Sequence, residues 1–284
     1  MKAIDLINGR LENEGISTSL QNKWFALISE LAAYQSAVVA YSGGVDSSLL
    51  AYTTTQVLGN KMVAVTVNSS IESPEMLKAA ADFAAQNGIK HDTIHYDPLH
   101  NPDFRSNPAM RCYHCKTDIL NILWNYARQY AYQVVLEGQN IDDLNDYRPG
   151  SKAIEETGTL SPLASNGLTK TEIRWLARAL GLSIWDQPSS PCLATRIPYD
   201  TIITEKALSQ IARAEKYLHQ KGFRVVRVRY NNELARIEVS PDQISLLLEL
   251  RKDIVSYFRQ IGFIYITLDL QGYRLGSMNE GLPL

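Results

Sequence analysis

The chain is predicted to form an α/β fold with a doubly wound parallel sheet, followed by a smaller C-terminal α+β domain. Short apolar runs alternate with segments of helical spacing over the first two thirds of the sequence, and a Gly-Gly turn separates the first run from its helix. Pro188, Pro191 and Pro198 then mark a change of pattern. We therefore expect two domains, residues 1–198 and residues 199–284.

The predicted N-terminal domain alternates strands with helices. The strands are short, apolar and rich in β-branched residues, whereas the helices repeat apolar residues every three or four positions. The predicted strands are Ala37–Tyr41, Met62–Val67, Thr93–Tyr96 and Gln133–Glu137, and the predicted helices are Gln21–Tyr34, Val45–Leu58, Pro74–Gln86, Cys112–Tyr130 and Leu168–Leu180. Ser42, Asn68 and Gly138 follow strands, and ligands of such sheets bind at the carboxyl ends of strands. The polar stretch after Gly138 is therefore expected to line an active site. The predicted helix over 168–180 is expected to be part of the scaffold.

The predicted C-terminal domain runs helix, two strands, helix, strand, an order of roughly ferredoxin-like type. Glycines end both helices, and an Asn-Asn pair separates the first two strands. The expected elements are Glu205–Gln220, Phe223–Tyr230, Leu234–Val239, Pro241–Gln260 and Phe263–Leu270.

The bulk composition restricts the class of partner. With a net charge of -2 and a pI near 6.2, the chain has no general attraction for nucleic acid. Its first residues contain scattered charges and no apolar core segment, so neither a signal peptide nor a membrane span is expected, and the cytoplasm is the expected compartment. Three cysteines, an odd number, argue against a disulfide framework.

The stretch V-V-A-Y-S-G-G-V-D-S-S, residues 38–48, combines a strand, a glycine turn and a helix start. The first amides of a helix lack intrahelical partners, so they attract an anion such as phosphate. Gly43 and Gly44 permit the backbone to approach a phosphate closely, and Ser42 and Ser47 add hydroxyl donors. Asp46 is suited to hold Mg²⁺ on a polyphosphate. An ordinary capped strand-to-helix turn is the alternative.

The string S-G-G-V-D-S lacks both the lysine of a Walker A loop and the third glycine of a dinucleotide fingerprint. It resembles the pyrophosphate loop (PP-loop) of the adenine-nucleotide α-hydrolases. That resemblance implies cleavage of ATP between the α and β phosphates and transfer of AMP to an acceptor.

The cysteines allow several interpretations. Cys112 and Cys115 form a C-x-x-C at a helix start, where thiolates are favoured, and Cys192 lies in a proline-rich segment. A thioredoxin-like pair leaves Cys192 unexplained, and a zinc site that uses His114 is disfavoured because position i+2 points away on a helix. An iron–sulfur cluster on three thiolates would leave one iron open for chemistry. Buried cysteines without a function are the remaining alternative.

Several further segments together resemble the LarE family of sulfur transferases, which act in nickel-pincer nucleotide biosynthesis. They are N-D-Y-R-P-G, G-L-T-K-T-E-I-R-W-L-A, S-S-P-C-L-A-T-R-I-P-Y, R-V-R-Y-N-N-E-L-A-R-I-E and L-D-L-Q-G-Y-R-L-G-S-M-N, and with the PP-loop they span about residues 37–280. The resemblance implies ATP-dependent adenylation of pyridinium-3,5-biscarboxylic acid mononucleotide and its conversion to a thiocarboxylate. It also implies a homohexamer of three dimers.

The resemblance also implies roles for particular residues. Ser42, Gly43, Gly44, Asp46 and Ser47 would bind ATP and Mg²⁺, Lys116 would offset phosphate charge, and Glu215, Arg227, Arg229 and Arg274 would bind the mononucleotide. Some members of the family sacrifice the sulfur of one cysteine near position 192. Others resemble this chain at Cys112, Cys115 and Cys192, and are thought to use a 4Fe-4S cluster.

The pair Arg227 and Arg229 also has an interpretation from spacing alone. Residues two apart on a strand share one face, so these arginines are expected to form a bidentate phosphate clamp. A solvated strand face with ion pairs is the alternative. For the whole protein, the alternatives are a tRNA thiolase with the same loop, an ammonia-using amide synthetase, and a nucleotide-binding metal sensor without catalysis.

Overall fold

The computed structural model describes residues 9, 17–144, 149–188, 191–274 and 277. The chain divides into two compact units. The first comprises Met1–Ser69, Pro74–Asp97 and Cys112–Ser190, and the second comprises Ser70–Ser73, Pro98–Arg111 and Pro191–Leu284. The expected functional division at residue 198 stays a prediction. Residues 145–148 of the N-D-Y-R-P-G segment lie outside the described residues.

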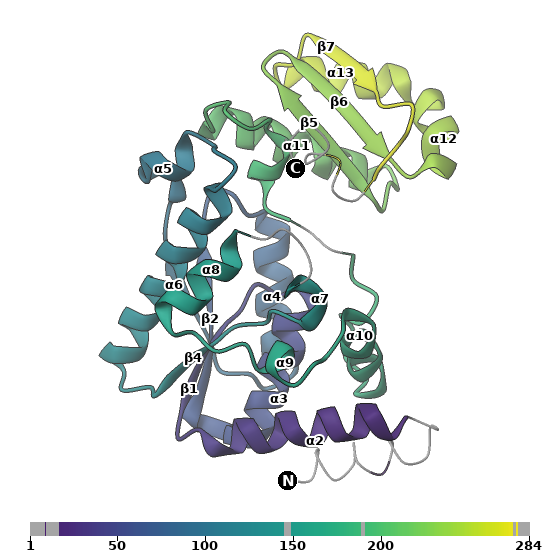
Figure 1. The fold of residues 1–284 in the computed structure, drawn as a ribbon. Helices are drawn as coiled ribbons and strands as arrows, with labels where there is room; N and C mark the ends of the chain where they lie inside the picture. Colours follow the sequence, from purple (N-terminus) through teal and green to yellow (C-terminus); the bar gives the residue numbers. More distant parts are fainter. Residues whose placement is uncertain (1–8, 10–16, 145–148, 189–190, 275–276, 278–284) are drawn as a thin grey trace. The chain divides into compact units, whose positions relative to one another are not determined.

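The first unit contains the predicted alternation of strands and helices (Figure 1). Its elements are α2 Thr18–Ala33, β1 Ala37–Ala40, α3 Val45–Leu58, η1 Gly59–Lys61, β2 Met62–Asn68, α4 Pro74–Gln86, β3 His91–His95, α6 Arg111–Gln129, β4 Val134–Leu136, α7 Ile141–Leu144, α8 Gly150–Thr157, α9 Pro162–Ser165 and α10 Lys170–Ala179. The four strands form one sheet in the order β3-β2-β1-β4, with every neighbouring pair parallel.

Helices cover both faces of this sheet, which confirms the doubly wound prediction. Successive strand residues point to opposite faces. Val39 accordingly packs in one core with residues of α2, α3 and α10, whereas Val38 packs in another with residues of α6 and α8 (Figure 1). The chain continues from β1 to β2 on one side, while β4 lies on the other side of β1. The carboxyl ends of β1 and β4 therefore border a topological switch point, where α/β sheets bind ligands.

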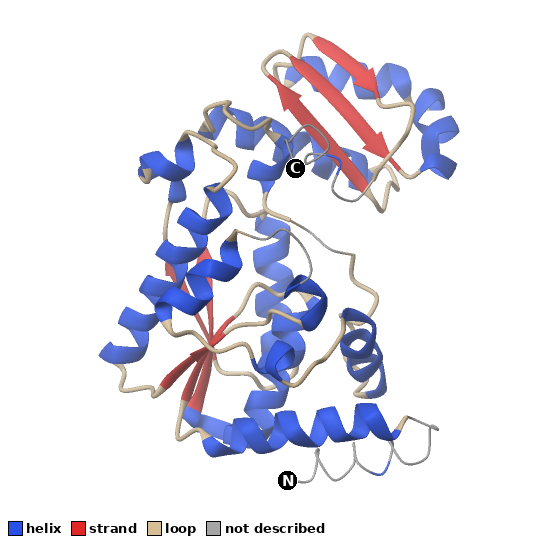
Figure 2. Cartoon of the chain, viewed as in Figure 1, coloured by secondary structure: helices blue, strands red, loops and turns tan. Residues whose placement is uncertain are grey.

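The second unit has a smaller mixed sheet and confirms the predicted α+β domain (Figure 2). Its elements are η2 Pro98–His100, α5 Pro102–Arg105, η3 Leu193–Arg196, α11 Glu205–Gln220, β5 Val226–Asn231, β6 Leu234–Val239, η4 Pro241–Gln243, α12 Ile244–Glu249, α13 Arg251–Gln260 and β7 Tyr265–Leu268. β5 pairs antiparallel with β6, and β6 pairs parallel with β7. Phe223, Phe258 and Phe263 are almost fully buried in its core.

The structure differs from the predicted elements in several places. The single helix predicted over 241–260 is divided, because Leu250 leaves helical geometry with φ -83° and ψ 3° between α12 and α13. The polar stretch after Gly138 contains the short helix α7, and η2 and α5 lie between β3 and α6, where no element was predicted. Such short helices have too few turns to show an apolar period. Among the described residues, no helix is long and apolar enough to cross a membrane.

Candidate active site

The glycine turn after β1 leaves the N-terminus of α3 open. Gly43 has φ +77°, a left-handed conformation, and a Cβ added there would lie 2.7 Å from the Cβ of Ala80. Only glycine fits both constraints. Gly44 is the N-cap of α3 and makes no side-chain capping hydrogen bond. The turn therefore presents a helix N-terminus that can bind an anion.

Two predicted hydroxyls lie within this turn. The hydroxyl oxygens of Ser42 and Ser47 are 3.1 Å apart, and the Ser42 amide donates to the Ser47 hydroxyl at 3.3 Å. The Ser47 hydroxyl also donates to the Gly44 carbonyl at 3.2 Å. These bonds hold the turn in shape. The five residues predicted to bind the nucleotide thus lie in one strand-turn-helix unit: Ser42, Gly43, Gly44, Asp46 and Ser47.

The loop after β4 approaches the same helix end closely. A Cβ added at Gly138 would lie 2.9 Å from the amide nitrogen and 3.1 Å from the Cα of Ser47. The backbones of two chain segments about ninety residues apart are therefore almost in contact, which a side chain would prevent. This contact places the polar stretch after β4 beside the glycine turn, as expected from the sheet topology.

Asp46 is held by two residues that sequence reasoning did not select. Its Oδ2 forms a close ion pair with Lys170 Nζ, and its Oδ1 accepts a hydrogen bond from Asn140 Nδ2 at 3.3 Å. Lys170 is the first residue of α10, which was expected to be scaffold only. The side chains of Asp46 and Lys170 are 19% and 35% exposed, so both can reach a ligand. One carboxylate near phosphates is sufficient for Mg²⁺, which keeps several waters and usually takes one or two carboxylates.

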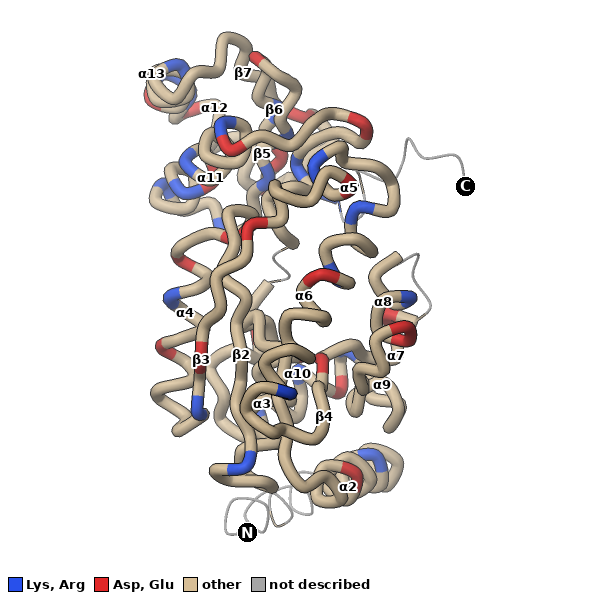
Figure 3. Tube along the Cα trace, turned by 90° about the vertical axis from the view of Figure 1, so that its left-hand side faces the viewer, with Lys and Arg blue, Asp and Glu red and all other residues tan. Residues whose placement is uncertain are grey.

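The position of Lys170 is secured by its backbone. Thr169 forms a capping box with Glu172 at the start of α10. The Lys170 amide donates to Asp142 Oδ2 at 2.7 Å. Asp142 belongs to α7, which carries acidic positions (Figure 3). The carboxylate of Asp142 therefore orders the backbone around the site.

Lys116 pairs with a buried carboxylate. Its Nζ lies 2.7 Å from Glu137 Oε2, and the two side chains are 34% and 5% exposed. Glu137 Oε1 also accepts hydrogen bonds from the Gln139 amide at 2.9 Å and from the Ser161 hydroxyl. Lys116 therefore compensates a buried charge at the end of β4, one residue before Gly138.

The three cysteines are divided between the two units. Cys112 and Cys115 lie in the first turns of α6, the former exposed and the latter buried. Cys192 belongs to the second unit, where it is the N-cap of η3. Within the described ranges, no three His, Cys, Asp or Glu side chains are gathered as a metal site. The two α6 thiols fit two positions of a cluster, since residues three apart on a helix share a face.

Arg196 organises the segment that contains Cys192. Its guanidinium is 2% exposed and binds Glu215 in bidentate fashion, with two N···O distances of 2.9 Å. Its Nη1 donates to the carbonyls of Pro191 at 2.7 Å and Cys192 at 3.1 Å, and to the Thr195 hydroxyl at 2.8 Å. Burial alone would lower the pKa of Arg196, but the Glu215 carboxylate outweighs this effect and raises it.

A second carboxyl group belongs to this neighbourhood. The Ile71 carbonyl accepts a hydrogen bond from the Leu193 amide at 2.8 Å. The next residue, Glu72, has a pKa raised to about 7 by burial, although the positive charge of Arg196 acts in the opposite direction. Sequence reasoning did not select Glu72, because no motif contains it.

The two predicted arginines of β5 have different surroundings. Arg229 forms a bidentate pair with Glu238 on β6, at 2.9 and 2.8 Å. Arg227 lies over the ring of Tyr273, with its guanidinium carbon 5.2 Å from the ring centre. Burial lowers the pKa of Arg227, and the nearby positive charge of Arg196 lowers it further.

Arg274, the fourth predicted substrate residue, lies beyond β7. Its Nη1 is 3.9 Å from Asp269 Oδ1, and Asp269 also lies 3.6 Å from Arg236 Nε. The four predicted substrate residues thus all belong to the second unit. Their arginines are accompanied by several carboxylates, so the surface is not simply cationic.

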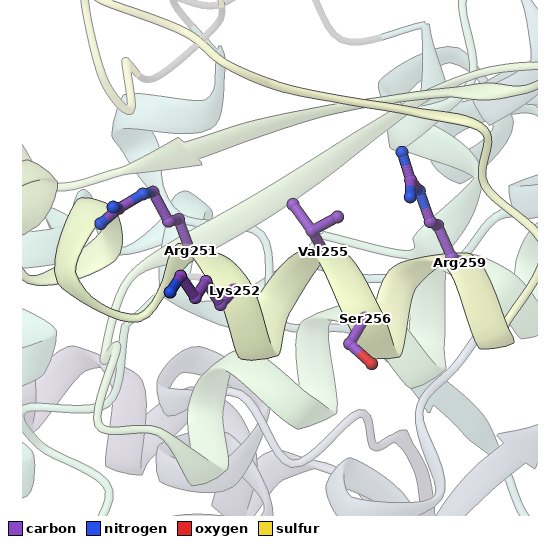
Figure 4. Close-up of a pocket in the computed structure, with 5 residues that line it drawn as sticks. All are labelled: Arg251, Lys252, Val255, Ser256 and Arg259. Carbon is purple, nitrogen blue, oxygen red and sulfur yellow. The ribbon is translucent and has the colours of Figure 1, made fainter.

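A pocket on α13 involves none of the predicted site residues. Its volume is about 550 Å³, and its described lining comes from one helix (Figure 4). The lining residues are Arg251, Lys252, Val255, Ser256 and Arg259. No step of the expected chemistry uses this pocket.

Comparisons with known proteins agree with this geometry. The NAD synthase family matches residues 23–190. An NH(3)-dependent NAD(+) synthetase of Staphylothermus marinus is 29% identical over 176 residues, which cover 58% of this chain and 62% of that protein. The open N-terminus of α3 at the switch point and this family match together define the class of protein. The chain belongs to the NAD synthase family of PP-loop enzymes, which use ATP.

Two other relatives extend over most of the chain. Pyridinium-3,5-bisthiocarboxylic acid mononucleotide synthase of Lactiplantibacillus plantarum is 36% identical over 265 residues, covering 93% of this chain and 96% of that protein. An uncharacterized protein of Synechocystis sp. is 43% identical over 248 residues, covering 87% and 92%. Within the PP-loop enzymes, the chain is a member of the LarE family, to which the first of these relatives belongs.

Proposed function

We propose that this protein is an ATP-dependent sulfurtransferase that converts pyridinium-3,5-biscarboxylic acid mononucleotide into its thiocarboxylic acid form. The observation that carries the proposal is the glycine turn, with Asp46 and Lys170 at an open helix N-terminus, in a chain that aligns over 93% of its length with the Lactiplantibacillus plantarum synthase. Its product would enter the biosynthesis of a nickel-pincer nucleotide.

The first proposed step is adenylation. A substrate carboxylate oxygen attacks the α-phosphorus of ATP, and the bond between that phosphorus and the bridging oxygen to the β-phosphate breaks. This yields an acyl adenylate and pyrophosphate, so a poor electrophile gains a good leaving group. The amides of α3 and the ammonium of Lys170 lie where they can neutralise the pyrophosphate. Mg²⁺, which we assign to Asp46, would supply further neutralisation of phosphate charge.

The second proposed step is sulfur transfer. A sulfur nucleophile attacks the acyl carbon of the adenylate, and the carbon–oxygen bond to AMP breaks, so that AMP leaves with its electron pair. We assign Cys192 to the site that delivers sulfur. We assign Lys116 to the part of the active site that neutralises the phosphate charge of ATP. The proposed cluster ligands are Cys112, Cys115 and Cys192. A 4Fe-4S cluster on these thiolates would supply an open iron that can bind sulfide.

We also propose that the second unit binds the mononucleotide. Arg227, Arg229 and Arg274 lie on or next to one small sheet, together with the buried Glu215. Guanidinium groups suit a phosphate because they donate parallel hydrogen bonds. By resemblance, the assembled form would be a cytoplasmic homohexamer, which a mass measurement by light scattering on the purified protein tests.

Adenylation is tested by pyrophosphate release. The protein is incubated anaerobically with ATP, Mg²⁺, sulfide and the pyridinium dicarboxylate mononucleotide, and pyrophosphate, AMP and thiocarboxylate are quantified. We expect all three products in equal amounts, and none without the mononucleotide. The variant Asp46→Asn should abolish pyrophosphate release, whereas Asp82→Asn, which removes an exposed carboxylate on α4, should not. Formation of a carboxamide from ammonia, with no sulfur source present, would instead identify an amide synthetase.

The origin of the sulfur requires a separate measurement. Iron, acid-labile sulfide and intact mass are determined on anaerobically purified protein before and after turnover. Stoichiometric iron with an unchanged mass supports the cluster, and each of Cys112→Ser, Cys115→Ser and Cys192→Ser should then lose iron. Absence of iron, with a chain lighter by one hydrogen sulfide, would mean that a cysteine is the sulfur donor.

A further inference from the structure

The turn that carries Cys192 is held from two sides by buried arginines. The turn consists of residues 191–197, and the Thr195 hydroxyl donates to the Cys192 carbonyl within it at 2.8 Å. Arg196 belongs to the turn itself, and Arg229 reaches it from β5. Both arginines are almost completely buried, at 2% and 9% exposed. Their donors therefore have few partners other than protein atoms.

On one side, Glu215 fixes Arg196 and connects it to the sheet. One carboxylate oxygen of Glu215 accepts hydrogen bonds from Arg196 Nε and from the Val228 amide, both at 2.9 Å. The other oxygen accepts from Arg196 Nη2 at 2.9 Å. Glu215 is 6% exposed, so its two oxygens are committed to the turn and to β5. Little capacity remains for direct binding of a substrate.

On the other side, Arg229 uses its guanidinium in the same way. Nε and Nη2 bind Glu238, Nη1 donates to the Thr195 carbonyl at 3.0 Å, and Nη2 also donates to the Ser277 hydroxyl at 2.8 Å. A guanidinium has five N–H groups, and these contacts engage every nitrogen. Arg229 thereby joins the Thr195 carbonyl to β6 through Glu238.

Arg227 lies two residues away on the same strand but contacts different groups. Its Nη1 donates to the neighbouring Val226 carbonyl at 2.7 Å, and its guanidinium lies over the Tyr273 ring.

We propose that Arg196, Glu215 and Arg229 are positioning residues for the Cys192 turn. Of the two arginines predicted as one clamp, Arg229 is thus assigned to the turn. The network ties the sulfur-bearing turn to β5 and β6. The positioning role concerns the protein alone, whereas its effect on turnover rests on the proposed function.

Hydrogen exchange tests the positioning role without substrate. Three amides of the turn are hydrogen-bonded: Leu193 to Ile71, Thr195 to Cys192 and Ile197 to Ala194. The matched variants are Arg229→Lys and Arg227→Lys, which make the same change two residues apart. We expect Arg229→Lys and Glu215→Gln to accelerate exchange of these amides at least tenfold. Arg227→Lys should leave them within twofold of the unmodified protein, and exchange in α13 serves as the folding reference.

Substrate binding by calorimetry distinguishes positioning from direct contact. Arg229→Lys should weaken binding of the mononucleotide by less than threefold but lower kcat. A loss of affinity of tenfold or more in Arg229→Lys, with unchanged exchange of the turn, would overturn the proposal and make Arg229 a direct ligand. If the unmodified protein fails to bind the mononucleotide, the proposed function fails, and the exchange experiment still decides the positioning role.

Discussion

Lys170 Nζ forms an ion pair with Asp46 Oδ2, although 124 positions separate the two residues in the chain. The pair joins the helix after the first strand to a helix that carries no recognised phosphate motif. Asn140 occupies the other carboxylate oxygen of Asp46. Binding of Mg²⁺ by Asp46 would therefore require at least one of these contacts to be exchanged, which leaves the Lys170 ammonium near the phosphates.

Replacement of Lys170 should therefore impair the nucleotide step. We expect Lys170→Met to lower kcat/KM for pyrophosphate release by about 100-fold, the typical effect of removing one charge-stabilising donor. Lys78→Met is the matched control, because Lys78 pairs with Asp82 on the exposed face of α4. Calorimetry with inorganic pyrophosphate gives a second readout, in which the Lys170 variant should bind more weakly. Unchanged pyrophosphate affinity and turnover would show that Lys170 only orders Asp46.

Gly138 should not tolerate a side chain. In Gly138→Ala, the new Cβ would lie 2.9 Å from a backbone nitrogen of α3, so the loop and the helix must separate. We expect a loss of about 1 to 3 kcal/mol in the free energy of unfolding, together with weaker ATP binding. Gly150→Ala is the control, since its nearest contact would be 3.7 Å away. Urea unfolding measures the free energy of unfolding of both variants. Equal stability of the two variants would contradict the close approach of the Gly138 loop to α3.

A double-mutant cycle separates the two possible tasks of Lys116. Lys116→Met leaves the buried Glu137 carboxylate without its cation and should cost about 3 kcal/mol of unfolding free energy. In the double variant, Glu137→Gln removes the unpaired carboxylate charge and should restore most of that stability. If Lys116 also contacts ATP phosphates, pyrophosphate release stays low in the double variant. Full recovery of activity would instead assign Lys116 a structural task alone.

The half-buried His91 should make stability depend on pH. Burial lowers its pKa below 6.5, and its Nε2 lies 2.8 Å from the Thr66 hydroxyl. The unfolded chain therefore binds a proton at a higher pH than the folded chain does, so stability falls as pH drops below about 6.5. His91→Gln should reduce the difference between urea midpoints at pH 7.5 and pH 5.5. His95→Gln, at an exposed position on the same strand, should leave that difference unchanged.

The parts of the site that are local in sequence could be predicted from the sequence. Gly43, Gly44 and Asp46 lie in one continuous motif, whose conformation follows from a strand, two glycines and a helix start. The C-x-x-C is equally local, since three-residue spacing on a helix places two thiols on one face. Apolar periodicity likewise identified the main strands and long helices, because burial of one face dictates that pattern.

The remaining parts could not be predicted, because they depend on contacts between distant segments. Lys170 was assigned to scaffold, since nothing in its helix indicates that the first residue reaches Asp46. Arg227 and Arg229 look equivalent on an isolated strand, yet Arg229 donates to Glu238 and to the Thr195 carbonyl, whereas the Arg227 guanidinium lies over the Tyr273 ring.

The fold class, the order of the elements and the chemistry of the phosphate turn are thus specified by the sequence, because all three follow from local backbone geometry and apolar period. Which charged side chains meet each other depends on the folded structure. A buried carboxylate or guanidinium must find a partner wherever the packed elements provide one, and that partner is specified by the folded backbone rather than by neighbouring residues.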